Sequence, residues 1–462
     1  MTPGASTFTP TAAIILGAGQ GTRMRSALPK VLHCVAGVPM VGHVLNTVTS
    51  LAMSPVVVVI GPGMESIAKA VAPHGTVLQA DRLGTGHAVL QAKDALAGFT
   101  GDILIAYADT PFVSAATIEK MLAARRGAGA PAVVVLGFAP EDPGSYGRLV
   151  MKDGALERIV EAKDASPAER AIGFCNSGIM LADAKVLWDA LAQVRNDNAK
   201  GEYYLTDIIA LARAAGHGCT AVEGAEDELM GVNSRAELAI AEGILQKKMR
   251  NAAMDNGVTL RDPETVYFSA DTKLGSDVEI GPFTVFGPGV TVDSGAVIKG
   301  FCHIEGAHIA GGAVVGPYAR LRPGAEIGAD AHVGNFVEIK NATLDVGAKV
   351  NHLTYVGDAH VGAKANVGAG TITANYDGYN KSRTEIGAGA SIGSNSVLVA
   401  PVKIGAGAMT GAGAVIRNDV PADALALNSS RQEMLEGFAA KYRVRKQAEK
   451  AKKATKNIGS DK

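Results

Sequence analysis

The sequence predicts an α/β protein of at least two domains, in which a layer with a largely parallel sheet precedes a parallel β-helix. The chain of 462 residues exceeds the usual size of a single domain. Short apolar runs alternate with helical patterns in its first half. From about Leu274 to Ile416, aliphatic side chains recur at every sixth residue with only short interruptions. Helices repeat about every 3.6 residues and amphipathic strands every two, so a coil with flat six-residue sides fits this step best.

Composition allows ample cores and makes several classes of protein poor candidates. Hydrophobic residues make up 47% of the chain, and the net charge of -1 gives no overall attraction to nucleic acid or to a membrane. The four cysteines show no C-x-x-C spacing, so we expect reduced thiols in a cytoplasmic protein. The apolar stretch 12–16 is too short for a signal peptide or a membrane span, and residues 1–11 are expected to be a disordered leader.

Strand and helix alternate through the first half. This order predicts a sheet whose ligands gather outside the carboxyl ends of its strands. Strands are expected at 12–16, 56–60, 103–106 and 133–137, and helices at 40–51 and 88–97.

The first strand runs into a glycine-rich loop, Gly17 to Met24, which Pro29 and Lys30 follow. Thr22 replaces the third glycine of a dinucleotide fingerprint, and no G-K-[ST] follows, so the loop matches neither that fingerprint nor a Walker A loop. Free backbone N–H groups together with Arg23 and Lys30 would neutralise a polyphosphate. Taken alone, the loop is equally compatible with a simple tight turn.

The string L-x-x-G-x-G-T-R-M followed by Pro29-Lys30 resembles the signature of sugar-nucleotide pyrophosphorylases. The resemblance implies a Rossmann-like (GT-A-like) uridylyltransferase domain over residues 12–235, with UTP as co-substrate and Mg²⁺ as cofactor. It implies Arg23 and Lys30 as phosphate-neutralising residues, and Asp109 and Asn233 as metal ligands. UTP and UDP-N-acetylglucosamine would contact Leu16, Gly17, Ala18, Gly19, Lys30, Gln79, Gly84, Thr85, Tyr107, Asp109, Gly147, Glu161, Asn176, Thr206 and Asn233.

Several of these residues also have ordinary interpretations. A lone glutamine such as Gln79 is usually solvated, and a strand-terminal Asp109 could cap a helix. Glu161 and Lys163 could lie on a solvated strand edge, and Thr206 opens a helix whose apolar face belongs to the core. The family usually has glycine at the position of Ala108. Alanine is also small, so a small residue is kept beside the expected metal ligand Asp109.

A capping box, Ser234 to Glu237, precedes a stripe of apolar residues and predicts a long helical linker over 236–256. At about 1.5 Å per residue it would span roughly 30 Å and hold two domains apart. An ordinary packed helix is the alternative.

The aliphatic-Gly repeat of the second half resembles the left-handed β-helix of hexapeptide-repeat acyltransferases, which places an acyltransferase domain over 257–462 with a basic tail that is solvated or disordered. The segment between Ala374 and Glu385 interrupts the repeat and is expected to protrude as a loop. Residues about 18 apart should lie on neighbouring coils, about 4.8 Å apart. Arg322 and Lys340 would then form a phosphate clamp.

The segment N-H-L-T-Y-V-G-D around His352 closely resembles the acetyltransferase active-site motif. With both halves matched in order, the chain resembles the bacterial bifunctional UDP-N-acetylglucosamine pyrophosphorylase / glucosamine-1-phosphate N-acetyltransferase family. The resemblance implies His352 as general base, a homotrimer built through the β-helix, and no nucleic-acid or membrane partner. It implies Arg322, Lys340, Tyr355 and Asn366 on glucosamine-1-phosphate, and Ala369, Asn375, Tyr376, Ser394, Ala412 and Arg431 along acetyl-CoA.

Two points stay open at this stage. A gap-free match places Ser429 where the family has a CoA-contacting arginine, with Arg431 two residues further on. A single-activity sugar-1-phosphate nucleotidyltransferase, whose β-helix serves only oligomerisation or regulation, is the alternative function.

Overall fold

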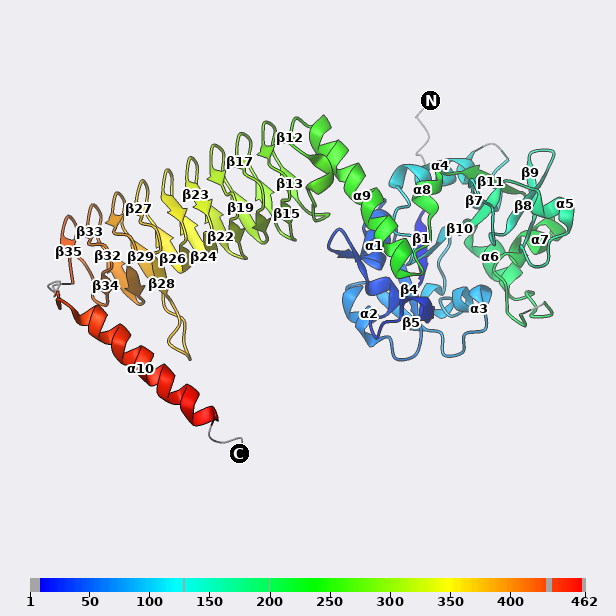
Figure 1. The fold of residues 1–462 in the computed structure, drawn as a ribbon. Coiled ribbons are helices and arrows are strands. Elements are labelled where there is room, and N and C mark those ends of the chain that lie inside the picture. Colours follow the sequence, from blue (N-terminus) through cyan, green and yellow to red (C-terminus); the bar gives the residue numbers. More distant parts are fainter. Residues whose placement is uncertain (1–8, 128, 199, 429–433, 459–462) are drawn as a thin grey trace, which may run out of the picture. The chain divides into compact units, whose positions relative to one another are not determined.

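A computed structural model describes residues 9–127, 129–198, 200–428 and 434–458, with side chains described up to residue 450. The chain divides into two compact units, Met1–Pro323 and Gly324–Lys462. The first holds the α/β domain and the first coils of the β-helix, and the second holds the remaining coils and a terminal helix (Figure 1). Most of the expected leader lies outside the described residues, and β1 already begins at Thr11.

The α/β domain contains a mixed sheet in the order β11-β7-β10-β6-β1-β4-β5. The central pairs β1–β4, β1–β6 and β4–β5 are parallel, as expected, whereas β10 runs antiparallel to both β6 and β7. The strands are β1 (Thr11–Leu16), β4 (Val56–Ile60), β5 (Gly75–Leu78), β6 (Asp102–Tyr107), β7 (Val133–Phe138), β10 (Cys175–Asp183) and β11 (Cys219–Glu223), with β8 (Arg148–Lys152) and β9 (Ala155–Val160) forming a hairpin beside β10.

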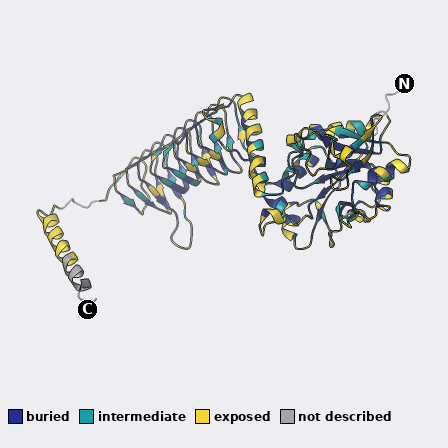
Figure 2. Ribbon diagram, turned by 45° about the vertical axis from the view of Figure 1, so that its right-hand side comes forward, coloured by how far each residue is buried: buried dark blue, intermediate teal, exposed yellow. Residues whose placement is uncertain are grey.

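Alternation along β1 divides the core into two layers. Ala12, Ile14 and Leu16 pack into one cluster, and Ala13 and Ile15 into the other. Because β1 is covered on both faces, it reads as a continuous apolar run and all six of its residues are buried (Figure 2).

The helices of this domain cover the two faces of the sheet. They are α1 (Met40–Ser50), α2 (Glu65–Ala70), α3 (Thr85–Leu90), α4 (Ala115–Arg126), α5 (Pro167–Arg170), α6 (Ala184–Leu191), α7 (Asp207–Ala214) and α8 (Glu226–Leu229). The helix expected at 88–97 is interrupted, because α3 ends at Leu90 and a 3-10 turn follows at Asp94–Leu96.

The predicted linker helix is α9 (Arg235–Asp255), and its capping box between Ser234 and Glu237 is present. The helix is packed within the first unit. The Gln246 side chain exchanges two hydrogen bonds with the backbone of Phe268, at 2.6 and 2.8 Å, and the buried Arg250 pairs with Glu264 at 2.9 Å. Near its start, Glu242 accepts a hydrogen bond from the backbone N–H of Ala36 at 2.7 Å. The helix is therefore packed against both the α/β domain and the first coils, and its role as a linker stays a prediction.

The six-residue step forms stacked coils of parallel strands, as predicted. In the first unit, Ile280 faces Ile298, which is 18 residues further on, and Ile298 faces Val315 after 17. The inward aliphatic side chains are almost completely buried. The strands are β12 (Thr259–Leu260), β13 (Lys273–Leu274), β14 (Glu279–Ile280), β15 (Val285–Phe286), β16 (Thr291–Val292), β17 (Val297–Ile298), β18 (His303–Ile304), β19 (Ala307–Ile309), β20 (Val314–Val315) and β21 (Arg320–Leu321).

The second unit continues the same pattern with longer strands beside the expected acyl-transfer site. The strands are β22 (Ala325–Ile327), β23 (His332–Asn335), β24 (Glu338–Leu344), β25 (Lys349–His352), β26 (Tyr355–Val361), β27 (Asn366–Val367), β28 (Ile372–Ala374), β29 (Thr384–Ile386), β30 (Ser391–Ile392), β31 (Val397–Val399), β32 (Val402–Ile404), β33 (Met409–Thr410), β34 (Val415–Ile416) and β35 (Leu425–Ala426). The predicted loop protrudes between β28 and β29, where Tyr379 is 91% exposed (Figure 1).

The basic tail forms α10 (Phe438–Ile458), and its described side chains are exposed, which agrees with a solvated segment. None of the helices in the described part of the chain has both the length and the apolarity that a membrane crossing requires.

Candidate active sites

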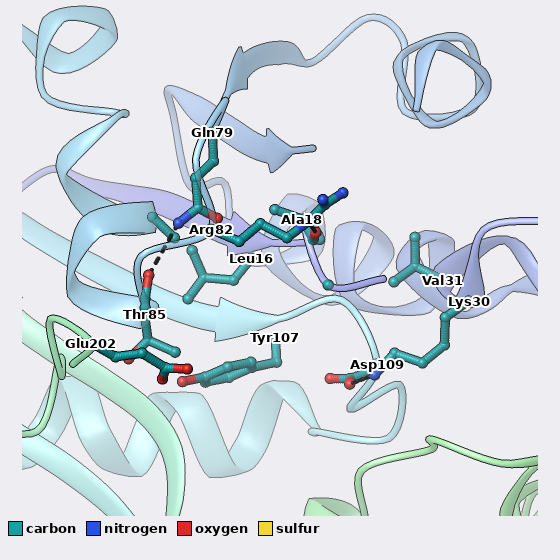
Figure 3. A pocket seen from close by; sticks show the side chains of 14 residues that line it. Leu16, Ala18, Lys30, Val31, Gln79, Arg82, Thr85, Tyr107, Asp109 and Glu202 are labelled. Atoms are coloured by element: carbon teal, nitrogen blue, oxygen red, sulfur yellow. Dashed lines mark hydrogen bonds and ion pairs between the residues drawn. The ribbon is translucent and has the colours of Figure 1, made fainter. Parts of the chain in front are cut away.

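A cavity of about 310 Å³ opens at the carboxyl ends of β1 and β6, where the predicted glycine loop begins (Figure 3). Ten of the residues implied by the family resemblance line it. The lining residues are Leu16, Gly17, Ala18, Gly19, Lys30, Val31, Gln79, Arg82, Gly84, Thr85, Ala88, Tyr107, Asp109 and Glu202.

The glycine loop is folded so that Lys30 returns to its end. Gly21 has a left-handed backbone (φ 60°), and a Cβ there would lie 2.6 Å from the Cβ of Lys30. A residue without a side chain is therefore needed at position 21. Arg23 lies in the following 3-10 turn with its side chain exposed.

Arg82 is a pocket residue that the sequence reasoning did not single out. Its Nε donates to the carbonyl oxygen of Ala18 at 2.8 Å, so its guanidinium lies against the glycine loop. The signal was present, because Arg82 stands inside the segment that resembles a uridine-reading motif. Glu202 also lines the cavity without having been predicted.

Gln79 is only 4% exposed, which excludes the interpretation of a solvated surface residue. Its amide nitrogen donates to the carbonyl oxygen of Gly84 at 3.1 Å and lies 3.2 Å from Nδ1 of His87, so the side chain is held within this segment. The adjoining segment is held by two backbone hydrogen bonds with Tyr203: Gly86 N–H donates to its carbonyl at 2.8 Å, and its own N–H donates to Leu83 at 2.7 Å.

The Lys30 side chain contacts both residues that are expected to bind the metal, Asp109 and Asn233. Its ammonium group forms an ion pair with the Asp109 carboxylate and donates to Oδ1 of Asn233 at 2.9 Å. The Asn233 amide nitrogen donates to the carbonyl oxygen of Gly231, which turns its oxygen toward the cation. Two oxygens thus converge on one position occupied by a cation, and this donor set fits a hard divalent ion.

No group of three or more His, Cys, Asp or Glu side chains in the described ranges is arranged to hold a metal ion. A magnesium ion at Asp109 and Asn233 would therefore draw its remaining ligands from phosphates and water, as is usual for this ion. Tyr107 lies beside this position. Burial, aided by the charges of Asp109 and Glu161, raises the pKa of Tyr107, so the phenol keeps its proton.

The residues expected to contact the sugar gather next to Tyr107. Asn176 N–H donates to the carbonyl oxygen of Gly147 at 2.8 Å, and Oδ1 of Asn176 accepts from Gly178 at 2.9 Å. A Cβ on Gly178 would lie 2.6 Å from the Tyr107 ring. Burial raises the pKa of Glu161, while a hydrogen bond from the side chain of Thr206 opposes the shift. The solvated-edge interpretation of Glu161 is therefore disfavoured.

The second site lies on the coils of the second unit. His352 ends β25 directly beside Asn335 of β23, and its Nδ1 lies 2.7 Å from Oδ1 of Asn335. An amide oxygen can only accept, so this contact favours the neutral tautomer with the hydrogen on Nδ1 and the lone pair on Nε2. The side chain of His352 is exposed. Asn335 was not assigned a role from the sequence.

Lys340 and Tyr355 lie on the adjacent strands β24 and β26, and Tyr355 follows His352 by three residues. Lys340 pairs in register with Gly357, and a Cβ on Gly357 would overlap the Tyr355 hydroxyl. Asn366 lies on β27 with its side chain exposed. Arg322 follows β21 in the first unit, and its joint role with Lys340 as a phosphate clamp stays a prediction.

Three small residues expected along acetyl-CoA lie one above the other on successive coils. Asn395 N–H donates to the carbonyl oxygen of Ala369 at 2.7 Å, and Gly413 N–H donates to that of Ser394 at 2.8 Å, which sets Ala412 above Ser394. Asn375 is buried and Tyr376 is exposed at the start of the protruding loop. Ser429 and Arg431 lie outside the described residues.

Comparison with known proteins matches both halves of the chain. Residues 13–199 match the family model of the MobA-like NTP transferase domain, and residues 271–306, 306–341 and 383–418 match the bacterial transferase hexapeptide repeat. These matches identify a Rossmann-like nucleotidyltransferase domain and a left-handed β-helix of hexapeptide repeats, as expected.

Curated relatives align over nearly the whole chain. The Bifunctional protein GlmU of Paramagnetospirillum magneticum is 61% identical over 442 residues, which cover 96% of this chain and 98% of the relative. That of Rhodospirillum rubrum is 63% identical over 437 residues, which cover 95% and 98%. Because the alignments span the nucleotide pocket and the histidine-bearing coils together, the single-activity alternative is not favoured. The chain belongs to the family of bifunctional GlmU enzymes, which confirms the family that its motifs indicated.

Proposed function

We propose that the chain makes UDP-N-acetylglucosamine in two steps, as a precursor for peptidoglycan and lipopolysaccharide. Residues 257–462 acetylate the amine of glucosamine-1-phosphate with acetyl-CoA. Residues 12–235 then transfer uridylyl from UTP to N-acetylglucosamine-1-phosphate and release pyrophosphate, and residues 236–256 link the two. Two observations carry the proposal: Lys30 contacts both Asp109 and Asn233, which belong to the same motif set, and the imidazole of His352 is held by Asn335.

Uridylyl transfer needs charge neutralisation and alignment. Lys30, Arg23 and Arg82 neutralise the triphosphate, and Gln79 with the backbone around Gly84 orients the uracil. When bound at Asp109 and Asn233, Mg²⁺ would supply further positive charge on the phosphates. The sugar phosphate oxygen is already ionised and attacks the α-phosphorus without a general base.

Acetyl transfer needs a base, because the amine of the sugar loses a proton as it attacks the thioester carbonyl. A new C–N bond forms, the C–S bond breaks, and the amine proton passes to Nε2 of His352. CoA leaves as the thiolate, which then takes that proton from the imidazolium, so that CoA is released as the thiol and the base is regenerated. Asn335 keeps the hydrogen on Nδ1, so Nε2 is the acceptor. A positioned base of this kind contributes roughly 10² to 10⁴ in rate.

The substrate contacts of this site are those that the family resemblance implies. Lys340, Tyr355 and Asn366 bind the sugar phosphate with Arg322. The small residues Ala369, Ser394 and Ala412 leave room for acetyl-CoA along the coils, and Asn375, Tyr376 and Arg431 complete its site.

We also propose that the protein is a cytoplasmic homotrimer assembled through the β-helix. Phe283, Phe301 and Tyr318 support this assembly, because they stack at 4.9 and 4.8 Å on successive corners while 46–54% of each residue is exposed. Exposed aromatic stripes of this kind are typical of interfaces. The four cysteines are free thiols, which agrees with a reducing compartment.

The test is a double dissociation in the full-length enzyme. Asp109→Asn should abolish uridylyl transfer and spare acetyl transfer, whereas His352→Ala should abolish CoA release and spare uridylyl transfer. Unchanged CoA release in His352→Ala would refute the base assignment and favour a β-helix with only an assembly role. Comparing N-acetylglucosamine-1-phosphate with glucose-1-phosphate as uridylyl acceptors tests the sugar.

A further inference from the structure

Asp358 is a buried carboxylate that the two proposed reactions do not use. It lies on β26, three residues after Tyr355, and is 8% exposed. Its backbone is left-handed (φ 47°), a conformation that is uncommon for a residue with a side chain. A buried carboxylate is costly unless it is hydrogen-bonded or paired, so its partners need to be identified.

The carboxylate joins three successive coils. Oδ1 accepts from the amide nitrogen of Asn341 on β24 at 2.6 Å, and Oδ2 accepts from the amide nitrogen of Asn375, which follows β28. A carboxylate only accepts hydrogen bonds, so both amides must present their NH₂ groups to it. The orientation of each amide is thereby fixed, with its oxygen pointing away from Asp358.

The group is held in its charged form. Partial burial alone would raise its pKa, but the hydrogen bonds from Asn341 and Asn375 and the positive charges of Lys340 and Lys381 lower the pKa of Asp358 below its usual value. A buried anion with two amide donors and two nearby cations is a satisfied network.

The partners of Asp358 stand next to residues of the proposed acetyl-transfer site. Asn341 directly follows Lys340, which we assign to the sugar phosphate. Asn375 directly precedes Tyr376 and opens the protruding loop, and its carbonyl oxygen also accepts the hydrogen bond from Ser382 that closes that loop. One carboxylate therefore connects the coil that binds the sugar phosphate to the base of the loop that borders acetyl-CoA.

We propose that Asp358 is a positioning residue for acetyl transfer, which fixes the Asn375 amide with its oxygen toward the ligand and aligns Lys340 with the acetyl-CoA loop. The inference rests on the proposed function of the second site. A purely structural role for Asp358 would stabilise the coils without affecting the reaction. The proposed positioning role makes acetyl transfer depend on the orientation of the Asn375 amide.

Asp358→Asn is the informative change. A carboxamide has the same size but only one acceptor oxygen, so it can satisfy either Asn341 or Asn375, and the other amide then faces an NH₂ group. The matched control is Asp330→Asn, because Asp330 is an exposed residue with the same left-handed backbone (φ 56°) in the same unit.

Both activities and thermal unfolding are measured on the full-length variants. In Asp358→Asn, kcat/KM for acetyl transfer should fall about tenfold or more, mainly through higher KM values for acetyl-CoA and glucosamine-1-phosphate. Uridylyl transfer should stay within twofold of wild type, and Asp330→Asn should change neither reaction. An unchanged acetyl-transfer kcat/KM in folded Asp358→Asn would overturn the inference.

A swap separates positioning from structure. In Asp358→Asn/Asn375→Asp, the new amide accepts from Asn341 and donates to the new carboxylate, so both hydrogen bonds and the net charge are restored. The unfolding temperature should recover while the KM for acetyl-CoA stays raised, because a carboxylate now stands where the amide oxygen was. Recovery of that KM together with the unfolding temperature would mean a structural role only and would overturn the inference.

A second variant covers the case in which Asp358→Asn does not fold. Asn341→Gly removes one donor at a position whose left-handed backbone (φ 44°) suits glycine. It should raise the KM for glucosamine-1-phosphate at least threefold, and an unchanged value would contradict the link to Lys340. Failure of the proposed function itself would appear differently, as wild-type enzyme that releases no CoA.

Discussion

Replacing Gly84 with alanine should strongly lower kcat/KM for uridylyl transfer, because the backbone there has φ 112° and ψ 176°. This region of conformational space is essentially restricted to glycine, and a side chain in it costs about 1–3 kcal/mol. The new Cβ would also lie 2.6 Å from the carbonyl oxygen and 2.8 Å from the nitrogen of Tyr203. Backbone must therefore move.

This backbone movement would weaken or break the two hydrogen bonds that Tyr203 forms with Gly86 and Leu83. Each contributes about 0.5–1.5 kcal/mol to stability. Together, the backbone cost and the two hydrogen bonds amount to a free-energy cost of about 2–6 kcal/mol for keeping the uridine segment in its present conformation. If the lower figure is lost from transition-state binding, kcat/KM for UTP falls roughly 30-fold, since about 1.4 kcal/mol corresponds to a factor of ten.

The assay is steady-state pyrophosphate release with UTP and N-acetylglucosamine-1-phosphate, with CoA release measured on the same preparation. The control is Gly63→Ala, because Gly63 has φ 74° but no atom within 4 Å of an added Cβ. It carries the backbone cost alone and should stay within threefold of wild type. Equal losses in both variants would refute the claim that contact with Tyr203 matters, and an unchanged KM for UTP in Gly84→Ala would refute the uridine assignment.

Three further predictions concern both sites. Asn335→Ala frees Nδ1 of His352, so kcat for acetyl transfer should fall about tenfold with uridylyl transfer unchanged in parallel assays. Gly357→Ala should raise the KM for glucosamine-1-phosphate in initial-rate measurements, because the added methyl overlaps the Tyr355 hydroxyl. Burial raises the folded-state pKa of Glu161 above 4.5, so its contribution to stability is present below that pH and is lost as the pH rises through the folded-state pKa. Glu161→Gln should therefore unfold at a higher temperature than wild type at pH 7 and lose that advantage near pH 4, and a constant difference in calorimetry would contradict the sign.

The sequence could predict the β-helix because its period is geometric. Each flat side places one aliphatic residue inward, so the spacing of 18 residues between Ile280 and Ile298 predicts that they pair on neighbouring coils. The direction of β10 could not be predicted, because the hairpin of β8 and β9 precedes it and the chain's direction across the sheet depends on packing. The extent of α3 was also overestimated, although the run to Ala97 is rich in helix-forming residues.

The site residues divide in a similar way. Lys30 and Asp109 each belong to a short contiguous segment and were predicted from it. The proposed roles of Arg82, Asn335 and Asp358 did not follow from the sequence, because each rests on a hydrogen bond to a residue on another strand or loop. Left-handed backbone at Asp358 leaves no mark on the sequence, since asparagine and aspartate also occupy ordinary turns.

The packing of α9 on the first coil has a practical consequence for anyone dividing the protein. Among the strands that the structure describes, β12 pairs only with β14, so its other edge is an edge of the sheet. Gln246 and Arg250 bring the helix against this end of the stack. A fragment that starts after Asn256 would remove that cover and invite end-to-end polymerisation, whereas a fragment that starts before Ser234 would keep it and remain monodisperse.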